Sequence, residues 1–408
     1  MIKYSSFDVA DLGPLAAIIP AREPEVRLAL NRLPVVQGRD AIIPVCEPTL
    51  HGNEEKYLLE CLRTNWISSA GRFITRFEAM FAAFCGTRYA VACTSGTAAL
   101  QLALYTLGIT AGDEVIIPTF TMVATANTVR HCGATPVFVD AEPRTWNIDP
   151  EKIEAAITPR TKAIMPVHTY GHPADMDRIL AIARRHRLLV IEDAAEAHGA
   201  MYKDRMAGSM GACGCFSFYA NKIVTTGEGG MITTDDEELA QKAHNIRDHA
   251  FSKERHFWHR APGHNFRMTN LQAAVGVAQM ERVEWLVERR IENAMRYNER
   301  LSDVRGITLP PATEGVRNVY WMYSILIGDD FGLARDEVRQ HLADNGIETR
   351  SFFVPMHLQP IYFRPEYLER FPVSEMLCRR GFYLPSSASL TDEQIDLVCS
   401  RLRALARR

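Results

Sequence analysis

Hydrophobic and polar positions divide most of the chain into short apolar runs and longer amphipathic stretches. Short apolar runs between turn-forming residues predict buried strands, and apolar positions that recur every three or four residues predict helices. The predicted strands are 89–93, 115–117, 135–139, 163–167, 188–191, 216–219 and 230–233. The predicted helices among them are 54–63, 75–84, 97–107, 149–157 and 176–186. This alternation indicates an α/β fold with a mostly parallel sheet and helices on both faces.

The C-terminal part of the chain has a different pattern. Residues 269–301 are rich in Ala, Glu, Arg and Val and predict one long helix that crosses between two domains. A strand at 320–327 and helices at 336–345 and 391–405 follow, which is typical of a small α+β domain. We therefore predict three parts: an N-terminal extension over 1–40, a large α/β domain over 41–285 and a small α+β domain over 286–408.

Lys222 is the first candidate for a catalytic residue. It lies between an aromatic, apolar stretch at 216–219 and a glycine-rich turn at 227–230. Burial disfavours the ammonium form and lowers the pKa of a lysine, so such an amine can form a Schiff base and later carry a proton. Taken alone, the same pattern also fits a lysine that flanks a buried strand with its head group in water.

A second candidate is Asp193, which follows the apolar run 188–191. Ligands of open α/β sheets bind at the carboxyl ends of such strands, so Asp193 is expected at the floor of a site. A buried carboxylate needs a partner, and a protonated pyridine nitrogen is one partner that keeps it ionised. A helix N-cap or an ion pair with an arginine is the alternative.

A third candidate is the turn formed by Ser95, Gly96 and Thr97, between the strand 89–93 and a strongly apolar helix. Backbone amides at the start of a helix, together with the helix dipole, bind phosphate without a basic side chain. An ordinary N-cap is the alternative. A phosphate cradle, a strand-end aspartate and a downstream lysine together indicate a site for pyridoxal 5'-phosphate.

The chain resembles a known family over the same motifs. Segments 95–99, 192–199, 217–222 and 226–230 are similar to those of the DegT/DnrJ/EryC1/StrS aminotransferases, which are sugar aminotransferases with the aspartate aminotransferase fold, fold type I. The resemblance runs from about residue 43 to near the C-terminus and implies a pyridoxal 5'-phosphate-dependent enzyme of this fold.

The resemblance also implies roles for individual residues. Lys222 would bind the cofactor covalently, and Asp193 would pair with its pyridine nitrogen. Glu196 falls where relatives place Gln, Glu or His near the phenolic oxygen of the cofactor. Ser217 matches a serine that contacts the phosphate, and Gly96 with Thr97 matches the backbone cradle.

Two further positions concern the dimer and the cofactor ring. Asn265 matches an asparagine that reaches the phosphate in the neighbouring subunit, which implies a homodimer with shared active sites. Met122 stands where many relatives have an aromatic residue over the cofactor ring, and its thioether can still pack against an aromatic face. Relatives that act as sugar dehydratases have His in place of Lys222, so the lysine favours amino transfer over dehydration.

By the same resemblance, the amino donor is L-glutamate and the acceptor is a keto sugar. Residues 219–230 and the glutamate at 196 are most similar to nucleotide-sugar 4-aminotransferases of the perosamine synthase type, which aminate a nucleotide-linked 4-keto-6-deoxyhexose. A 3-keto sugar nucleotide or an oxidised octulosonate, on a route to 8-amino-Kdo, would use the same residues. A dehydratase with this cofactor and a non-catalytic regulator that keeps the fold are alternatives of another class.

Three further features are candidates for substrate binding. His168 ends the predicted strand 163–167 and lines the site or belongs to the core. Arg350 lies where relatives bring small-domain residues toward the sugar, although a surface ion pair is equally common for arginine. The basic, aromatic loop 250–262 predicts either a cover over a phosphate-bearing sugar or a solvated loop.

Composition limits the other possibilities. The chain has 408 residues, of which 47% are hydrophobic, and a formal net charge of −3, which offers no general attraction for nucleic acid. Its nine cysteines are scattered without a metal-binding or redox spacing, and no histidine pair has the spacing of a zinc helix, so no metal is expected. We expect a cytoplasmic protein that does not enter the membrane, because the uncharged stretch 89–112 divides into strand, turn and helix and no secretory leader is recognisable.

Overall fold

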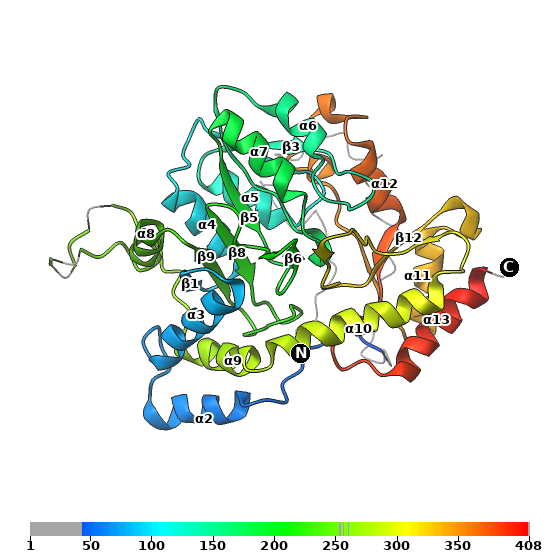
Figure 1. Ribbon diagram of the computed structural model, residues 1–408, viewed down its shortest axis with the longest axis horizontal. Coiled ribbons are helices and arrows are strands. Elements are labelled where there is room, and N and C mark those ends of the chain that lie inside the picture. Colours follow the sequence, from blue (N-terminus) through cyan, green and yellow to red (C-terminus); the bar gives the residue numbers. More distant parts are fainter. Residues whose placement is uncertain (1–42, 253, 256, 260, 407–408) are drawn as a thin grey trace, which may run out of the picture.

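A computed structural model of the protein describes residues 43–252, 254–255, 257–259 and 261–406. The extension predicted over 1–40 lies outside these residues. Figure 1 shows a larger part built around one sheet and a smaller part at the other end of the molecule, with helix α10 (Val283–Leu301) running along both.

The larger part contains a seven-stranded sheet. In spatial order its strands are β1 (Tyr89–Cys93), β9 (Gly230–Thr234), β8 (Cys213–Ser217), β5 (Leu189–Asp193), β4 (Thr161–Ile164), β2 (Glu114–Pro118) and β3 (Thr135–Val139). β9 runs antiparallel to both of its neighbours, and all other neighbours pair in parallel. The predicted mostly parallel sheet is confirmed, and its apolar strands are buried because helices cover both faces.

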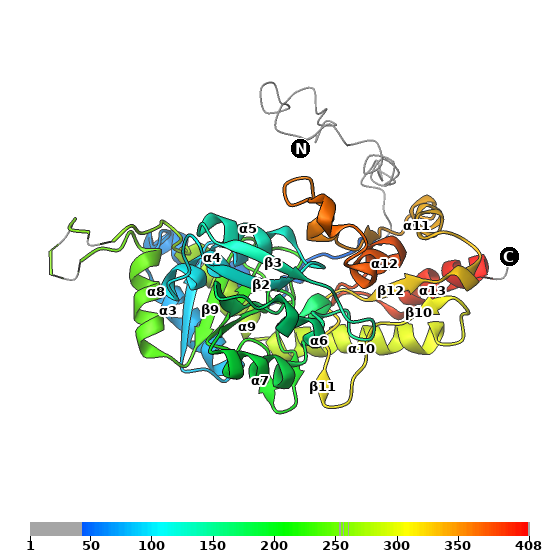
Figure 2. The ribbon, with the colours of Figure 1, turned by 90° about the horizontal axis from the view of Figure 1, so that it is seen from above.

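Two groups of helices cover the sheet, and Figure 2 shows α5 (Val123–His131) and α7 (Met176–His186) on opposite sides of it. One face packs against α4 (Gly96–Thr106), α5 (Val123–His131) and α8 (Glu237–Arg247). The other face packs against α3 (Arg72–Cys85), α7 (Met176–His186) and α9 (Asn270–Met280). Outside these lie α2 (Glu54–Thr64), which packs on α9, and the short α6 (Pro150–Ile153) with the turns η2 (Glu154–Ala156) and η3 (Thr169–Gly171).

The prediction of a single helix over 269–301 is wrong. The structure has two helices, α9 and α10, separated at Glu281 and Arg282. Arg282 leaves the helical conformation with φ −126° and ψ 13°. The carboxylate of Glu281 accepts hydrogen bonds from the Tyr57 hydroxyl and the Asn53 amide, each at 2.6 Å. These contacts hold the end of α9 against α2, and α10 begins just after them.

The smaller part is an antiparallel sheet covered by helices, which confirms the predicted α+β arrangement. Its strands are, in spatial order, β10 (Ile307–Thr308), β12 (Ser324–Ile327), β14 (Gly381–Tyr383) and β13 (Arg350–Ser351). Its helices are α11 (Arg335–Asp344), α12 (Pro372–Arg380) and α13 (Asp392–Ala406), with the turns η4 (Asp329–Phe331), η5 (Met356–Leu358) and η6 (Pro365–Tyr367). A three-stranded sheet of β11 (Val316–Arg317), β6 (Met201–Tyr202) and β7 (Arg205–Met206) joins the two parts.

The first described residues pack on the smaller part. Ile43 pairs with Ile347 in a parallel bridge and is buried in the core beneath α11 and α13. Along the chain, the larger part is therefore inserted between two segments of the smaller part. The sequence analysis instead assigned the residues from 41 onward to the large domain. The proposed boundary at 285 falls inside α10, which belongs to both parts.

Asp140 connects the end of β3 to the start of α12. Its side chain is almost completely buried, at 1% exposure. One carboxylate oxygen accepts from the hydroxyl of Ser374 at 2.6 Å and from its backbone N–H at 2.9 Å. The other accepts from the N–H of Val373 and from Nζ of Lys152, each at 3.2 Å. One carboxylate in the larger part thus satisfies the first N–H groups of a helix in the smaller part.

We predict that Asp140→Ala lowers the free energy of unfolding by about 3 kcal/mol, because it removes a helix cap and leaves buried donors without an acceptor. Urea denaturation followed by circular dichroism measures this loss. Asp236→Ala is the matched control: Asp236 caps α8 at an exposed position within one part, and its loss should cost about 1 kcal/mol. Equal losses in the two variants would contradict the prediction.

Candidate active site

The site lies at the carboxyl edge of the seven-stranded sheet. β5 ends at Asp193, β8 ends at Ser217, and β1 leads into Ser95. These strands run in the same direction, so their ends meet at one edge. A cavity of about 370 Å³ opens there, a size typical of small-molecule sites. The predicted site residues that line it are Ser95, Gly96, Thr97, Met122, Asp193, Glu196, Ser217, Lys222 and Arg350.

One end of the cavity is formed by the start of α4. Ser95 is the N-cap of this helix, and its hydroxyl accepts from the N–H of Ala98 at 3.1 Å. The N-cap alternative therefore describes this side chain correctly, and the first two helical residues, Gly96 and Thr97, line the cavity as well. Gly96 has no room for a side chain: a Cβ would lie 2.6 Å from Cβ of Ser217. Together these residues offer backbone amides and a hydroxyl of the kind that binds phosphate.

Asp193 forms the floor of the cavity. It is 5% exposed, and one oxygen accepts from the Thr125 hydroxyl at 2.7 Å, while the other accepts from the N–H of Ala195 at 3.2 Å. Burial raises the pKa of this carboxyl, and these hydrogen bonds oppose the shift. In the part of the chain that the structure describes, no lysine, arginine or histidine forms a salt bridge with Asp193. Both alternatives from the sequence, a helix N-cap or a bound arginine, are thus absent here, and a protonated ring nitrogen fits the carboxylate.

A hydroxyl chain behind Asp193 was not predicted. Thr125 donates to Asp193 and shares a hydrogen bond of 2.9 Å with the hydroxyl of Thr121. Both threonines are completely buried. They belong to the segment after β2, and a threonine near a helix start gives no sequence signal for a partner 68 residues away.

Lys222 points into the same cavity. Its side chain is 9% exposed, and Nζ lies 3.8 Å from Oε1 of Glu196. Nζ also lies 3.4 Å from the centre of the Trp321 ring. Burial lowers the pKa of the lysine, and the carboxylates of Glu196 and Asp193 oppose this shift. The alternative of a lysine with its head group in water does not hold, and the amine is placed to act as a nucleophile and proton carrier.

Glu196 is the acid nearest to the lysine amine. It is 5% exposed, and its second oxygen accepts from the N–H of Tyr170 at 2.8 Å. Burial raises the pKa of Glu196 to about 7, against the opposing effects of Lys222 and this N–H group. A carboxyl group with such a pKa changes its protonation near neutral pH, which an amide at this position could not do.

His168 does not line the cavity, so the expectation of a substrate contact is corrected. The ring is completely buried: Nε2 lies 2.9 Å from Oε2 of Glu192, and Nδ1 accepts from the N–H of Ala174 at 3.1 Å. Its neighbour Val167 lines the cavity instead. Successive side chains of an extended segment point to opposite sides, so His168 faces the protein interior.

Asn265 also lies outside the cavity of its own chain. It is exposed, and its side-chain oxygen accepts from Nε of Arg267 at 3.1 Å. Met122 lines the cavity and is 49% exposed. In the loop predicted as a cover, Lys253 and Arg260 lie outside the described residues.

The smaller part supplies walls that the sequence analysis missed. Trp321, Phe353 and Tyr383 line the cavity together with Arg350. The Arg350 side chain is 56% exposed, and Nη2 lies 3.4 Å from Oε1 of Glu348, so it forms the surface ion pair that the sequence allowed while still reaching the cavity. These residues come from β12, β13 and β14 and the segments beside them, and no local motif marks them.

Comparison with known proteins agrees with this geometry. Residues 48–403 match the DegT/DnrJ/EryC1/StrS aminotransferase family. The chain belongs to this family. GDP-perosamine synthase of Caulobacter vibrioides is 50% identical over 361 residues, which are 88% of this chain and 97% of that protein. GDP-perosamine synthase of Escherichia coli O157:H7 is 43% identical over 360 residues, with the same shares of each chain, 88% and 97%.

A solved structure extends the likeness to three dimensions. The crystal structure of S. venezuelae DesV matches this aminotransferase with a TM-score of 0.82 and 38% identity, over 87% of this chain and 95% of that one. The predicted aspartate aminotransferase fold and the predicted cofactor, pyridoxal 5'-phosphate, are confirmed, as is a sugar aminotransferase of amino-sugar biosynthesis. The enzyme acts on a keto sugar with an amino donor.

Within the described residues, no cluster of His, Cys, Asp and Glu is arranged to hold a metal ion. None of the described helices combines the length and apolar character needed to cross a bilayer.

We predict that Gly96→Ala weakens binding of pyridoxal 5'-phosphate at least about tenfold, because the added methyl group meets Ser217 and displaces the cradle. Titration of the cofactor absorbance measures the affinity. Gly328→Ala is the matched control, since a Cβ there meets its nearest neighbour only at 3.4 Å. Native affinity in Gly96→Ala would refute the placement of phosphate at this helix end.

Proposed function

We propose that this aminotransferase moves an amino group from L-glutamate to C4 of a nucleotide-linked 4-keto-6-deoxyhexose. The observation that supports this proposal most is the 50% identity with a GDP-perosamine synthase over nearly the whole length of both chains. The cavity presents Arg350, whose guanidinium suits phosphate or carboxylate groups of a substrate.

We assign the covalent and proton-transfer steps to Lys222. Pyridoxal 5'-phosphate, when bound, supplies a carbonyl carbon that bonds to amines and a ring that accepts electrons. Lys222 would hold the cofactor between turnovers, and its amine would be free to act as a base while the donor is bound. That amine would then take the proton from the α carbon of glutamate. With the keto sugar, the same amine would deliver a proton to the carbon that receives the amino group, and the keto oxygen would leave as water.

Other residues hold the cofactor in place for these steps. Asp193 keeps the ring nitrogen protonated, and the buried hydroxyls of Thr125 and Thr121 fix the orientation of its carboxylate. Gly96, Thr97 and Ser217 hold the phosphate. Glu196 lies beside the lysine amine, near the position that the phenolic oxygen occupies in relatives, and Met122 packs on the ring.

The substrate assignment predicts a selective reaction. Purified protein with L-glutamate should convert a GDP-linked 4-keto-6-deoxyhexose to the amine in which CH–NH2 replaces the C=O group, as detected by mass spectrometry. A 3-keto sugar nucleotide and an 8-oxo-octulosonate are the comparison substrates. Lys222→Arg keeps the charge but loses the nucleophile, so we expect at least a 10³-fold loss of turnover, on the order of 4 kcal/mol in barrier height. Full activity of Lys222→Arg, or amination of a comparison substrate alone, would overturn the assignment.

We also propose a homodimer with shared active sites. Asn265 is exposed and lies outside its own cavity, which leaves it available to the site of a second copy. An apolar surface on α2 and the residues after it also supports association, because contiguous exposed apolar residues are typical of interfaces. Its members are Leu59, Leu62, Trp66 and Ile67.

Mixed dimers test the sharing of sites. A dimer of one Lys222→Arg subunit and one Asn265→Ala subunit contains one fully native site if Asn265 acts across the interface. We therefore expect about half of native activity from purified mixed dimers, while each parent homodimer is impaired. If Asn265 acted within its own subunit, both sites of the mixed dimer would be defective and no activity would be recovered.

We infer a cytoplasmic location as well. The nine cysteines of the chain are all free in the structure, as expected in a reducing compartment.

A further inference from the structure

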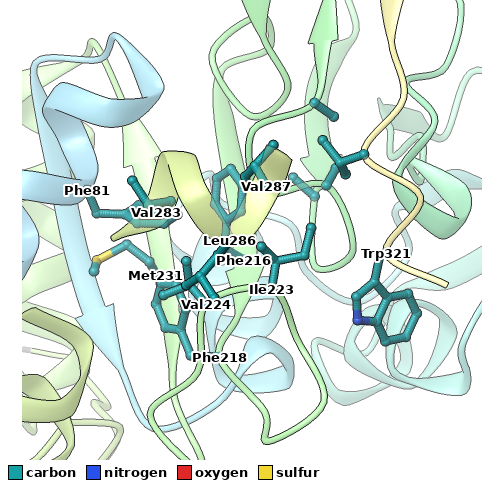
Figure 3. Close-up of a cluster of buried hydrophobic side chains, with 14 of the residues drawn as sticks. Phe81, Phe216, Phe218, Ile223, Val224, Met231, Val283, Leu286, Val287 and Trp321 are labelled. Atoms are coloured by element: carbon teal, nitrogen blue, oxygen red, sulfur yellow. The ribbon is translucent and has the colours of Figure 1, made fainter. Parts of the chain in front are cut away.

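Trp321 forms part of the cavity wall and contacts the amine of Lys222. Its ring centre lies 3.4 Å from Nζ of Lys222, within the range of a cation–π interaction. Trp321 is 4% exposed. Figure 3 shows it at the edge of the buried cluster that contains Phe216, Phe218 and Ile223, the last of which directly follows Lys222. The indole is thus held between the core and the amine.

Three hydrogen bonds fix the position of this tryptophan. The indole N–H donates to the carbonyl of Asn221 at 2.8 Å, so the ring is attached to the backbone next to Lys222. Its backbone N–H donates to the carbonyl of Tyr170 at 3.1 Å. Its own carbonyl accepts from the buried guanidinium of Arg290 at 3.0 Å. The ring therefore cannot rotate away without breaking a bond to the lysine segment.

The surroundings of the Lys222 amine strengthen its attraction to the face of the Trp321 ring. Burial removes water from the ammonium form of Lys222 and lowers its pKa, while Glu196, Asp193 and Cys46 oppose the shift. The ring of His198 lies near enough to be affected by the lysine charge. An aromatic face attracts a cation more strongly where water is excluded. The remaining titratable groups of the cavity wall are Tyr219, Glu228, Arg350 and Tyr383.

We propose that Trp321 is a positioning residue for the proton transfers of Lys222: its indole face holds the amine in one place while the amine carries a proton. A lysine side chain has four rotatable carbon–carbon bonds, and it must return the proton to a defined atom after leaving the cofactor. The indole ring and the carboxylate of Glu196 each contact the ammonium group, and together they restrict where it can lie. This inference rests on the proposed catalytic role of Lys222.

The test measures the lysine directly. The full chain is loaded with pyridoxamine 5'-phosphate, so that the Lys222 amine is free, and is pulsed with an acylating reagent at a series of pH values. Mass spectrometry of the Lys222 peptide then gives the pKa of the amine. We expect this pKa to fall by about one unit in Trp321→Leu, because the ring no longer stabilises the ammonium, and to fall less in Trp321→Phe, which keeps an aromatic face.

Trp285→Leu is the matched control, because Trp285 is 40% exposed on α10 and contacts Arg282 rather than Lys222. Its variant should leave the lysine pKa unchanged. If Trp321→Leu does not fold, protein made with fluorinated tryptophan keeps the shape of the ring and weakens its attraction for cations, and the pKa should fall stepwise with fluorination. An unchanged pKa in a folded Trp321→Leu variant or in the fluorinated protein would overturn the proposal.

The outcome is separable from that of the proposed function. If Lys222→Arg retained turnover, the catalytic role of the lysine would be refuted whatever its pKa. If Lys222→Arg were inactive and the pKa did not respond to Trp321, only the role of the tryptophan would be refuted.

Discussion

The arrangement of the site depends on a carboxylate buried without a cationic partner from its own chain among the described residues. Asp193 lies at the end of a central strand, and its neighbours supply a hydroxyl and an N–H group. Burial of an unpaired carboxylate anion costs free energy, and the positive charge of a pyridinium nitrogen beside it would offset that cost. The phosphate cradle and Lys222 line the same cavity as this carboxylate, so one small aromatic molecule can contact all three.

The two parts of the chain contribute different properties to the cavity. The sheet edge supplies the groups that hold the cofactor, because parallel strands bring their carboxyl ends together. The smaller part supplies Trp321, Phe353 and Tyr383, which close the cavity from the other side. Gly171 permits this approach: a Cβ there would lie 3.0 Å from the backbone nitrogen of Trp321, and its φ of +94° favours glycine.

The sequence was sufficient for groups that lie within one contiguous motif beside a strand. Lys222, Asp193 and the turn at Ser95 each have a local signal, and all of them line the cavity. Prediction from the sequence failed where the role of a residue depends on the direction of its side chain or on partners far away in the chain. Position at a strand end did not reveal that His168 faces Glu192, and residues of the smaller part such as Trp321 have no local signature. The break between α9 and α10 was also missed, because Glu281 is a good helix former whose partners lie far away in the chain.

The parallel bridge between Ile43 and Ile347 has a consequence for biosynthesis. About 300 residues separate the two partners, so all of the chain between them must leave the ribosome before this contact can form. The sheet with its helices can assemble during translation, whereas the smaller core must wait for the last helix. In that interval the apolar surface beneath α13 is open to solvent, and exposed surface of this kind promotes aggregation of incompletely folded chains.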